Sequence, residues 1–359
     1  MEKTIGVLGA TGLVGNSLVN KVLETSGNNL IIAGRTEKTL QELQHRSGRI
    51  IDFFILDATN EEDLRRFYAK VDLVVNCLGP SHSQRTAPAK IAIEASIPYL
   101  ESGVSLLNCS EKDVTEIDAN AQKHYTMLVT GVGFFPGLSR VLLQYAATTF
   151  YDVDHLKISV IFNNPLSAGS AVDMLLESRQ QVAVVEKQQW IHQRFGSQGE
   201  TICFSAPFLR QRVYASPPVD TLLHFPKNIR NFTLKTGTGS IISDALLLLH
   251  SLNTRSFRLT EVMSIPLRYA STINRYLLPY GCAMRMDVSG EKKTRSENAL
   301  VTLYHADTFV ATASVIALGV DFLLKHNVNK AGVFTFGEVV NPPELLDRLR
   351  SKDFIIEGI

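Results

Sequence analysis

The sequence predicts an α/β protein: a doubly wound parallel sheet formed by the first part of the chain, with an α+β domain inserted before the last segment. Short apolar runs alternate with segments of helical spacing up to about residue 130, which predicts the parallel sheet. After about residue 150 the apolar runs come in pairs around short polar turns, which predicts antiparallel hairpins and hence a second domain.

Six strands are expected in the parallel sheet. They are residues 3–8, 30–33, 52–56, 72–76, 98–101 and 126–130. Helices are predicted to follow the first five strands, with turn or cap residues at their starts: the turn GATGLVG, Thr36, Asn60, Thr86 and Ser110. Because parallel neighbours need crossover connections, this alternation predicts a doubly wound sheet.

The inserted domain is expected to cover residues 151–304, and the first domain residues 1–150 together with about 305–359. Strand 155–162 and two hairpins are predicted in the insertion; the hairpins pair 188–194 with 201–205 and 283–289 with 299–304. Two helices, 241–252 and 261–278, belong with it, and Pro266 is expected to break or kink the second. An apolar helix at 310–325 and a final helix opened by Pro342 and Pro343 end the chain.

Composition excludes several classes of protein. The chain has 359 residues and a formal net charge of +1, so we expect no nucleic-acid partner. Its four cysteines form no CxxC and its nine histidines no ligand cluster, so no metal is expected and a cytoplasmic location is predicted. The most apolar window, 310–324, contains Asp321 and is short for a bilayer, so no transmembrane helix is expected.

Three glycines follow the first strand with the spacing G-x-x-G-x-x-G. Gly9, Gly12 and Gly15 stand between a strand and a helix, where glycines allow a tight turn and a close approach to a pyrophosphate. The free N–H groups at the helix N-terminus attract the same group. The motif therefore predicts dinucleotide binding; the alternative is a tight turn without a ligand.

The end of the second strand suggests which dinucleotide is preferred. NAD-binding folds usually carry an acid about 20 residues after the glycines, to bind the ribose 2′-OH. Here the strand ends in Gly34, Arg35 and Thr36, so there is room for a 2′-phosphate and a guanidinium to pair with it. We therefore expect NADP(H) to be preferred over NAD(H), unless Glu37 neutralises Arg35 or binds the ribose itself.

The fourth and fifth strands end in polar residues that could serve catalysis. NCLGP, residues 76–80, closes the fourth strand, where the nicotinamide half of a cofactor would lie. Four side chains near these strand ends are candidate acids or substrate ligands, or else surface and packing residues: His82, Arg85, Tyr99 and Glu101. Of these, His82, Tyr99 and Glu101 are our candidate catalytic residues.

Two other enzyme classes fit less well. Short-chain dehydrogenases use a Tyr with Lys four residues later, and none of the ten tyrosines has that partner. Cys109 precedes a helix at Ser110, where a thiol pKa can fall as in a nucleophilic cysteine. A small residue packed beside a helix cap explains Cys109 more simply.

A family resemblance joins these motifs. GATGLVG, IIAGRTEKTL, Asp57, VVNCLGP, PYLESG, GVGFFPGLSRVL and AGVFTFGEVVNPPELLDRL occur in the order found in saccharopine dehydrogenase-like oxidoreductases, which the chain resembles over about residues 1–145 and 305–355. The resemblance implies a Rossmann-type NADP-binding domain and an inserted domain that covers a small-molecule substrate and often dimerises. It also implies hydride transfer to an imine.

The resemblance also assigns cofactor contacts by motif. Pyrophosphate contacts fall on Gly9, Thr11, Gly12, Leu13, Val14 and Gly15; 2′-phosphate contacts on Gly34, Arg35 and Thr36; adenine-side contacts on Asp57 and Ala58; nicotinamide-side contacts on Cys77, Leu78, Gly79 and Pro80.

One position departs from the family pattern. Members that use amino acids resemble G-x-D-P-G, with a carboxylate facing the substrate, whereas this chain has Phe135 at that place. Phe135, a candidate substrate-binding residue, cannot balance a substrate ammonium. The alternatives to an imine reductase are therefore an enoyl reductase of a lipid- or carrier-bound substrate and a catalytically silent NADP-binding sensor.

Overall fold

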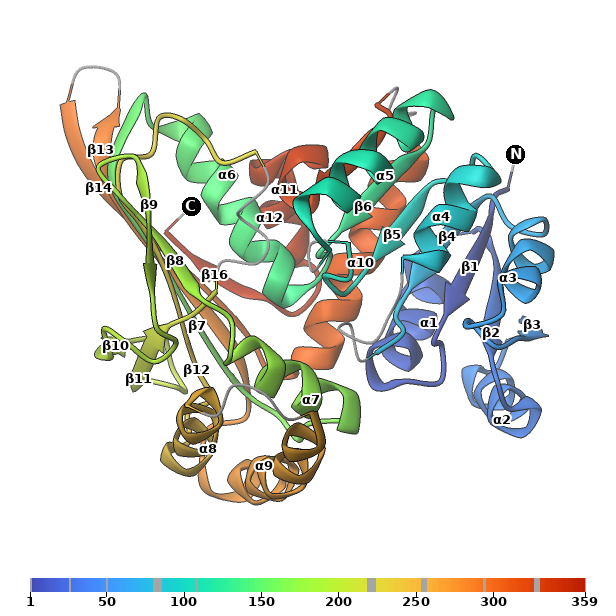
Figure 1. Cartoon of the computed structure of the whole chain (residues 1–359), viewed down its shortest axis with the longest axis horizontal. Coiled ribbons are helices and arrows are strands. Elements are labelled where there is room, and N and C mark those ends of the chain that lie inside the picture. Colours follow the sequence, from blue (N-terminus) through green and yellow to red (C-terminus); the bar gives the residue numbers. More distant parts are fainter. Residues whose placement is uncertain are drawn as a thin grey trace. The chain divides into compact units, whose positions relative to one another are not determined.

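The computed structural model divides the chain into two compact units (Figure 1). The first comprises Met1–Leu138 and Phe309–Val340, and the second Ser139–Thr308 and Asn341–Ile359. The structure describes residues 2–25, 27–49, 51–79, 86–106, 109–217, 224–252, 257–292, 295–325 and 330–358. Each unit is built around its own sheet.

The sheet of the first unit has seven strands in the order β15-β6-β5-β4-β1-β2-β3, and all neighbours are parallel. The strands are β1 (Thr4–Leu8), β2 (Asn29–Gly34), β3 (Asp52–Ile55), β4 (Leu73–Asn76), β5 (Tyr99–Glu101), β6 (Met127–Thr130) and β15 (Gly332–Thr335). The six strands expected from the sequence are confirmed, and the doubly wound parallel sheet with them.

Helices follow the first five strands at the positions that the sequence predicts. They are α1 (Leu13–Thr25), α2 (Glu37–Ser47), α3 (Glu61–Tyr68), α4 (Ala87–Glu94) and α5 (Glu111–Lys123). The segment after β6, η2 (Phe134–Leu138), has non-helical backbone angles at Phe135, Pro136 and Gly137, and a short helix, α11 (Phe336–Val339), follows β15; neither was predicted. The side chain of Asn60 caps α3 and that of Ser110 caps α5, each accepting hydrogen bonds from first-turn amides.

One further helix of this unit, α10 (Thr308–Lys325), is long and apolar enough to cross a membrane by length and composition. Half of its apolar window is buried within the structure. A Cβ added at Gly319 would lie 3.0 Å from Phe336 and 3.3 Å from Leu100, so this part of the helix packs closely on the first unit. These contacts are those of a core helix.

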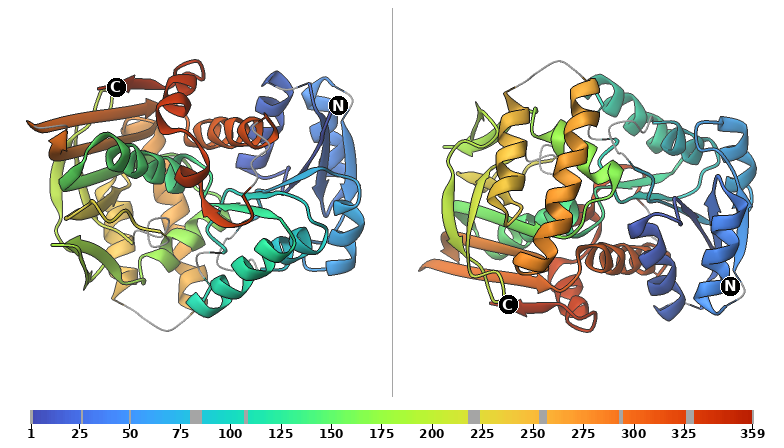
Figure 2. Two further views of the ribbon diagram at one scale, coloured as in Figure 1. Left: turned by 90° about the horizontal axis from the view of Figure 1, so that it is seen from above. Right: turned by 90° about the horizontal axis from the view of Figure 1, so that it is seen from below.

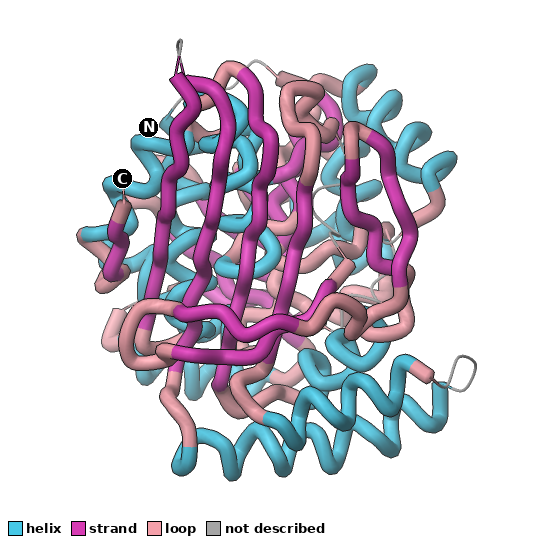
Figure 3. Tube along the Cα trace, turned by 90° about the vertical axis from the view of Figure 1, so that its left-hand side faces the viewer, coloured by secondary structure: helices cyan, strands magenta, loops and turns pink. Residues whose placement is uncertain are grey.

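The second unit contains a mixed nine-stranded sheet (Figure 3). Its main path is β10-β11-β12-β7-β13-β14-β16, and β8 pairs with both β12 and β9. The strands are β7 (Asp152–Asn163), β8 (Val182–Glu186), β9 (Gln189–Gln193), β10 (Glu200–Cys203), β11 (Arg210–Ala215), β12 (Phe232–Gly237), β13 (Gly281–Lys292), β14 (Arg295–His305) and β16 (Ile355–Glu357). The sheet is not purely antiparallel, because β7 and β12 run parallel.

Five helices accompany this sheet. They are α6 (Ser139–Thr149), α7 (Ala168–Glu177), α8 (Ile241–Ser251), α9 (Phe257–Leu277) and α12 (Pro342–Arg350). Residues 139–150 and 341–359 therefore group with the second unit, whereas they were expected in the first. The pairing of β16 with β14 is one reason, since it joins the last residues to the second sheet.

One predicted hairpin is wrong and another is confirmed. Strand β9 pairs with β8 rather than β10, and β10 pairs with β11. Between β8 and β9, Lys187 and Gln188 both have positive φ (51° and 65°), as in a tight two-residue hairpin turn. This turn lacks the glycine or asparagine that would have signalled it. The second hairpin forms as predicted, with Ala283 opposite Tyr304.

The expected break at Pro266 is also wrong, because α9 is assigned as one helix from Phe257 to Leu277. Pro266 and Val262, whose carbonyl would normally accept from residue 266, both lie on the exposed side of the helix. Water can therefore satisfy the carbonyl that Pro266 leaves without its usual donor.

Candidate functional site

The candidate site lies at one edge of the first unit's sheet. Because the seven strands are parallel, the loops after their carboxyl ends meet at this edge. The chain order reverses beside β1, which lies between β2 and β4. In open α/β sheets such a reversal opens a crevice where nucleotides bind.

The glycine turn after β1 has a distinct role for each glycine. Gly9 has a φ of 72°, which disfavours other residues, and the N–H of Gly12 donates to its carbonyl oxygen at 3.0 Å. A Cβ on Gly15 would lie 2.2 Å from the Gly9 oxygen, so Gly15 lets α1 start against the turn. A Cβ on Gly12 would meet only the Gly9 oxygen, at 3.3 Å, so the space beside Gly12 is open.

The segment after β4 lies directly against this turn. The N–H of Cys77 donates to the Leu8 oxygen at 3.0 Å, and a Cβ on Gly9 would lie 2.9 Å from the carbonyl carbon of Cys77. Burial raises the pKa of the Cys77 thiol to about 12, so this cysteine stays protonated near neutral pH. Around Gly79 an added Cβ would meet no atom within 4 Å. The pyrophosphate and nicotinamide segments predicted from the sequence are thus neighbours.

At the ends of β2 and β3 the structure brings together Arg35 and Asp57. Hydrogen bonds from the backbone and hydroxyl of Thr59 lower the pKa of Asp57, and the nearby charge of Arg35 lowers it further. Glu37 accepts a hydrogen bond from Gln41 at 3.1 Å, and within the described ranges it forms no ion pair with Arg35. The guanidinium is exposed at the strand end.

The predicted cofactor residues differ in exposure. Seven of them are exposed: Thr11, Gly12, Leu13, Arg35, Thr36, Asp57 and Gly79. Six are half-buried: Gly9, Val14, Gly34, Ala58, Cys77 and Leu78. Gly15 is buried. Pro80, His82 and Arg85 lie outside the described residues.

The two other predicted catalytic residues, Tyr99 and Glu101, lie in the interior. Each is only 1% exposed. The Tyr99 hydroxyl donates to Glu101 Oε2 at 3.1 Å and accepts from the amide of Asn76 at 2.7 Å. Asn76 Oδ1 in turn accepts from the backbone N–H of Leu78 at 3.0 Å. A continuous hydrogen-bond chain therefore runs from Glu101 to the segment after β4.

Glu101 accepts hydrogen bonds from four groups. Besides Tyr99, these are the hydroxyl of Thr130 at 2.5 Å, the backbone N–H of Leu106 at 3.1 Å, and the hydroxyl of Ser105. Burial raises the pKa of Glu101, and the four donors oppose part of that increase because they favour the carboxylate. Burial likewise raises the pKa of Tyr99 well above its ordinary value. The network links the ends of β4, β5 and β6.

Asn76, Ser105 and Thr130 are members of this network that were not predicted from the sequence. Asn76 and Thr130 are the last residues of their strands, and a polar residue at the end of a buried strand is the available signal. Nothing in the sequence shows that both would approach Glu101. Their association depends on β5 lying between β4 and β6.

Phe135 lies in the loop after β6 and is half-buried. The loop is tightly folded: Gly137 has a φ of 128°, and a Cβ there would lie 2.8 Å from the Gly131 oxygen. The backbone N–H of Val132 donates to the Glu101 carbonyl oxygen at 2.9 Å. The start of the loop that carries Phe135 is thereby joined to the end of β5.

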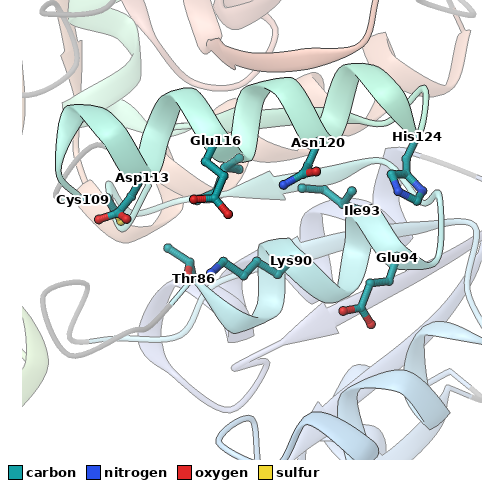
Figure 4. A pocket seen from close by; sticks show the side chains of 10 residues that line it. Thr86, Lys90, Ile93, Glu94, Cys109, Asp113, Glu116, Asn120 and His124 are labelled. Atoms are coloured by element: carbon teal, nitrogen blue, oxygen red, sulfur yellow. The ribbon is translucent and has the colours of Figure 1, made fainter.

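A separate groove of about 600 Å³ runs between α4 and α5 (Figure 4). It is lined by Thr86, Lys90, Ile93, Glu94, Cys109, Asp113, Glu116, Ile117, Asn120 and His124. Burial raises the pKa of the Cys109 thiol, which does not suit an activated nucleophile. Within the described ranges, no group of three or more His, Cys, Asp or Glu residues could hold a metal ion.

Comparison with known proteins agrees with this geometry. Residues 5–129 match the family described as saccharopine dehydrogenase NADP binding domain. Apo saccharopine dehydrogenase (L-Glu forming) from Saccharomyces cerevisiae superposes with a TM-score of 0.68 at 13% identity, covering 99% of this chain and 100% of that one. No curated protein sequence matches the chain.

Two further solved structures share the fold at lower similarity. A mutant meso-dapdh with DAP from Clostridium tetani has a TM-score of 0.51 and 12% identity, covering 98% of this chain and 99% of that one. An engineered D-amino acid dehydrogenase bound to NADP⁺ has a TM-score of 0.50 and 12% identity, covering 98% of this chain and 100% of that one.

The parallel sheet and the matched family model identify residues 5–129 as a Rossmann-type NADP-binding domain, and the domain match supports an oxidoreductase. Over residues 5–129 the chain is similar to the family described as saccharopine dehydrogenase NADP binding domain. The resemblance seen in the sequence is confirmed.

Proposed function

We propose that this protein is an NADPH-dependent reductase that transfers hydride to a C=N bond, the imine of an amine and a carbonyl compound. The observation that carries the cofactor assignment is the combination of an open glycine turn with the exposed Arg35 at the end of β2. The support for an imine is the resemblance to saccharopine dehydrogenase and to a D-amino acid dehydrogenase. The cytoplasmic location remains a prediction.

The residues present fit a dinucleotide with a 2′-phosphate. The open space beside Gly12 suits a pyrophosphate. The free N–H groups at the N-terminus of α1 would attract it, and no acidic residue in the first turn opposes this attraction. At the other end, a Cβ on Gly34 would make only an ordinary contact of 3.4 Å with Leu40, so glycine leaves room beside Arg35. Arg35 and Thr36 would hold the 2′-phosphate, and Asp57 and Ala58 would lie on the adenine side.

The bound cofactor would supply a hydride to the substrate carbon. The protein's own task on the nicotinamide side is positioning. Asn76 holds the N–H of Leu78, and Tyr99 and Glu101 hold Asn76, so residues 77–79 are fixed against the glycine turn. In this arrangement Tyr99 and Glu101 would hold residues 77–79 in place through Asn76 and would not exchange protons with a substrate. The role of His82 remains a prediction.

Phe135 bears on the substrate class. If it lines the substrate cavity, an ammonium there would lack a fixed counter-charge, and burying it would cost several kcal/mol. A less polar imine is therefore the proposed substrate. The same observation favours the second candidate, reduction of an enoyl double bond in a lipid- or carrier-bound compound, since such substrates carry no ammonium near the reacting carbon.

Steady-state oxidation of NADPH distinguishes these possibilities. The protein is assayed with cyclic imines, with an amino acid plus an aldehyde, and with enoyl thioesters. Turnover of the imines alone supports the proposal, and turnover of the enoyl thioesters alone supports the second candidate. Tight NADPH binding without oxidation by any of these compounds would instead favour a silent sensor.

A further inference from the structure

The groove between α4 and α5 carries charges of opposite sign on its two sides. The two helices lie side by side in the first unit (Figure 2) and run in the same direction, because each leads into a strand of the parallel sheet. Lys90 lines the groove from α4, whereas Asp113 and Glu116 line it from α5. The carboxylate of Glu116 points from α5 toward α4, where the amino group of Lys90 lies (Figure 4). One cation thus faces two carboxylates across the groove.

Two of these charges are not neutralised by their neighbours. Among the described residues, the side chains of Lys90 and Glu116 form no hydrogen bond or ion pair, with each other or with any other group. Glu94, at the end of the groove where α4 finishes, is by contrast held by Arg65 at 3.0 Å. A lysine can donate three hydrogen bonds and a carboxylate can accept several. Lys90 and Glu116 therefore keep their full capacity to bind a ligand.

The floor of the groove is apolar. Ile93 and Ile117 line it and are only 5% and 3% exposed. Cys109, which is half-buried, lines the groove near the start of α5. Burial raises the pKa of the Cys109 thiol; among the nearby charges, Asp113 raises it further and Lys90 lowers it. The positive and the negative charge therefore both act near the same end of the groove.

The size and the charges of the groove indicate which kind of molecule fits. Its volume of about 600 Å³ falls within the roughly 300–1,000 Å³ of typical small-molecule sites. A simple cation would come close to Lys90, and a simple anion would come close to Asp113 and Glu116; like charges brought together cost free energy. A metal ion does not suit the site, because no three His, Cys, Asp or Glu residues in the described part of the chain could hold one. A dipolar molecule fits this pattern of charges best.

We propose that the groove binds a free α-amino acid with an apolar side chain. Such a molecule carries a carboxylate and an ammonium on one carbon, so it can contact both sides of the groove at once. Its carboxylate pairs with Lys90 and its ammonium with Glu116 and Asp113. Its side chain lies on Ile93 and Ile117, where apolar surface is removed from water. The groove shares no lining residue with the predicted cofactor site, so this inference does not rest on the proposed function.

Calorimetric titration of the full chain without cofactor tests the proposal. The probes share one branched side chain: L-leucine, 3-methylbutylamine, which lacks the carboxylate, and 4-methylpentanoate, which lacks the ammonium. We expect L-leucine to bind with a dissociation constant of about 1 mM or below. Each analogue should bind at least about tenfold more weakly, since each loses a charge-assisted hydrogen bond.

Substitutions on the two sides of the groove locate the binding. Lys90→Met should weaken L-leucine about tenfold, to the level of 3-methylbutylamine, and Glu116→Gln should weaken it toward the level of 4-methylpentanoate. Lys70→Met and Glu62→Gln are the matched controls, because they make the same changes at exposed positions outside the groove. Both controls should bind L-leucine as the wild type does. Circular dichroism and the unfolding midpoint show whether each variant is folded.

Three results would overturn the proposal. The first is a wild type whose dissociation constant for L-leucine lies above about 10 mM. The second is binding of 3-methylbutylamine as tight as that of L-leucine, which would indicate a site for a simple cation. The third is L-leucine binding that neither Lys90→Met nor Glu116→Gln weakens, which would place the amino acid elsewhere. Each of these results leaves the NADPH assignment untouched, because no cofactor enters the titration.

Discussion

Replacing Glu101 with leucine removes the acceptor at the centre of the buried network. The N–H of Leu106 would lose the carboxylate oxygen that it now contacts at 3.1 Å. Three hydroxyls would lose the same acceptor, although that of Thr130 can still turn to the Gly103 oxygen at 3.4 Å. A buried donor without an acceptor costs about 1–3 kcal/mol. Because the hydroxyls can partly reorient, we expect Glu101→Leu to lower the free energy of unfolding by about 3 kcal/mol.

Urea denaturation at pH 7, followed by circular dichroism, measures this change. Glu101→Gln keeps the shape and one acceptor oxygen, so it should cost less than Glu101→Leu, about 1 kcal/mol. Glu116→Gln changes an exposed carboxylate on α5 and should leave the midpoint unchanged. A Glu101→Leu variant within 0.5 kcal/mol of the wild type would refute the view that this network supports the fold.

The pH dependence of stability gives a second readout of Glu101. Its folded pKa is raised above the ordinary value of 4.5, so the folded state holds the proton more tightly than the unfolded state. The part of the stability that comes from this tighter proton binding is therefore complete below about pH 4.5 and is lost as the pH rises through the folded pKa, whereas the hydrogen bonds to the carboxylate remain. The Glu101→Gln variant should lack this decrease. Parallel pH profiles for variant and wild type would contradict the assignment.

Three further predictions follow from the site and the cysteines. Gly12→Val should abolish NADPH binding in a protein that still folds, and NADPH binding by the folded variant would contradict the role given to this glycine. Gly15→Ala should instead lower the unfolding midpoint, because its Cβ would lie 2.2 Å from the Gly9 oxygen. Phe135→Asp should shift NADPH oxidation toward amine-bearing substrates. A wild-type kcat/KM near about 10⁴ M⁻¹s⁻¹ with an amino acid plus an aldehyde would contradict the view that Phe135 disfavours a substrate ammonium. With a disulfide reagent at pH 8, exposed Cys203 should react before Cys109, whose pKa is raised by burial, as mass spectrometry can check.

The sequence predicts six of the seven strands of the first sheet because each of them carries a local signal, whereas β15 was not predicted. Glycines mark the turn at Gly9, Asn60 and Ser110 cap helices, and the strands are nearly continuous apolar runs. The second sheet is less predictable. The hairpin of β8 and β9 turns at Lys187 and Gln188, residues with no strong turn preference, so its pairing could not be found from local sequence.

In the candidate site, too, some residues carry a local sequence signal and others depend on tertiary contacts. The residues of the glycine turn and Arg35 act through backbone geometry or charge, which a motif can indicate. The hydrogen bonds of Glu101 depend instead on tertiary contacts, because Thr130 lies 29 residues further along the chain. A sequence can show that Glu101 ends a strand, but only the strand order shows that its carboxylate is enclosed and held by four donors.

Cofactor binding is the most direct test of the central claim, that Arg35 at the end of β2 makes this an NADPH-dependent enzyme. Isothermal titration calorimetry compares NADPH and NADH with the wild type, with Arg35→Ala and with Glu37→Ala as the neighbouring control. We expect NADPH to bind the wild type about ten- to a hundredfold more tightly than NADH, since a charged hydrogen bond contributes roughly 1.5–3 kcal/mol. Arg35→Ala should remove most of this preference, and Glu37→Ala should keep it. Equal affinities of the wild type for the two cofactors would contradict the claim.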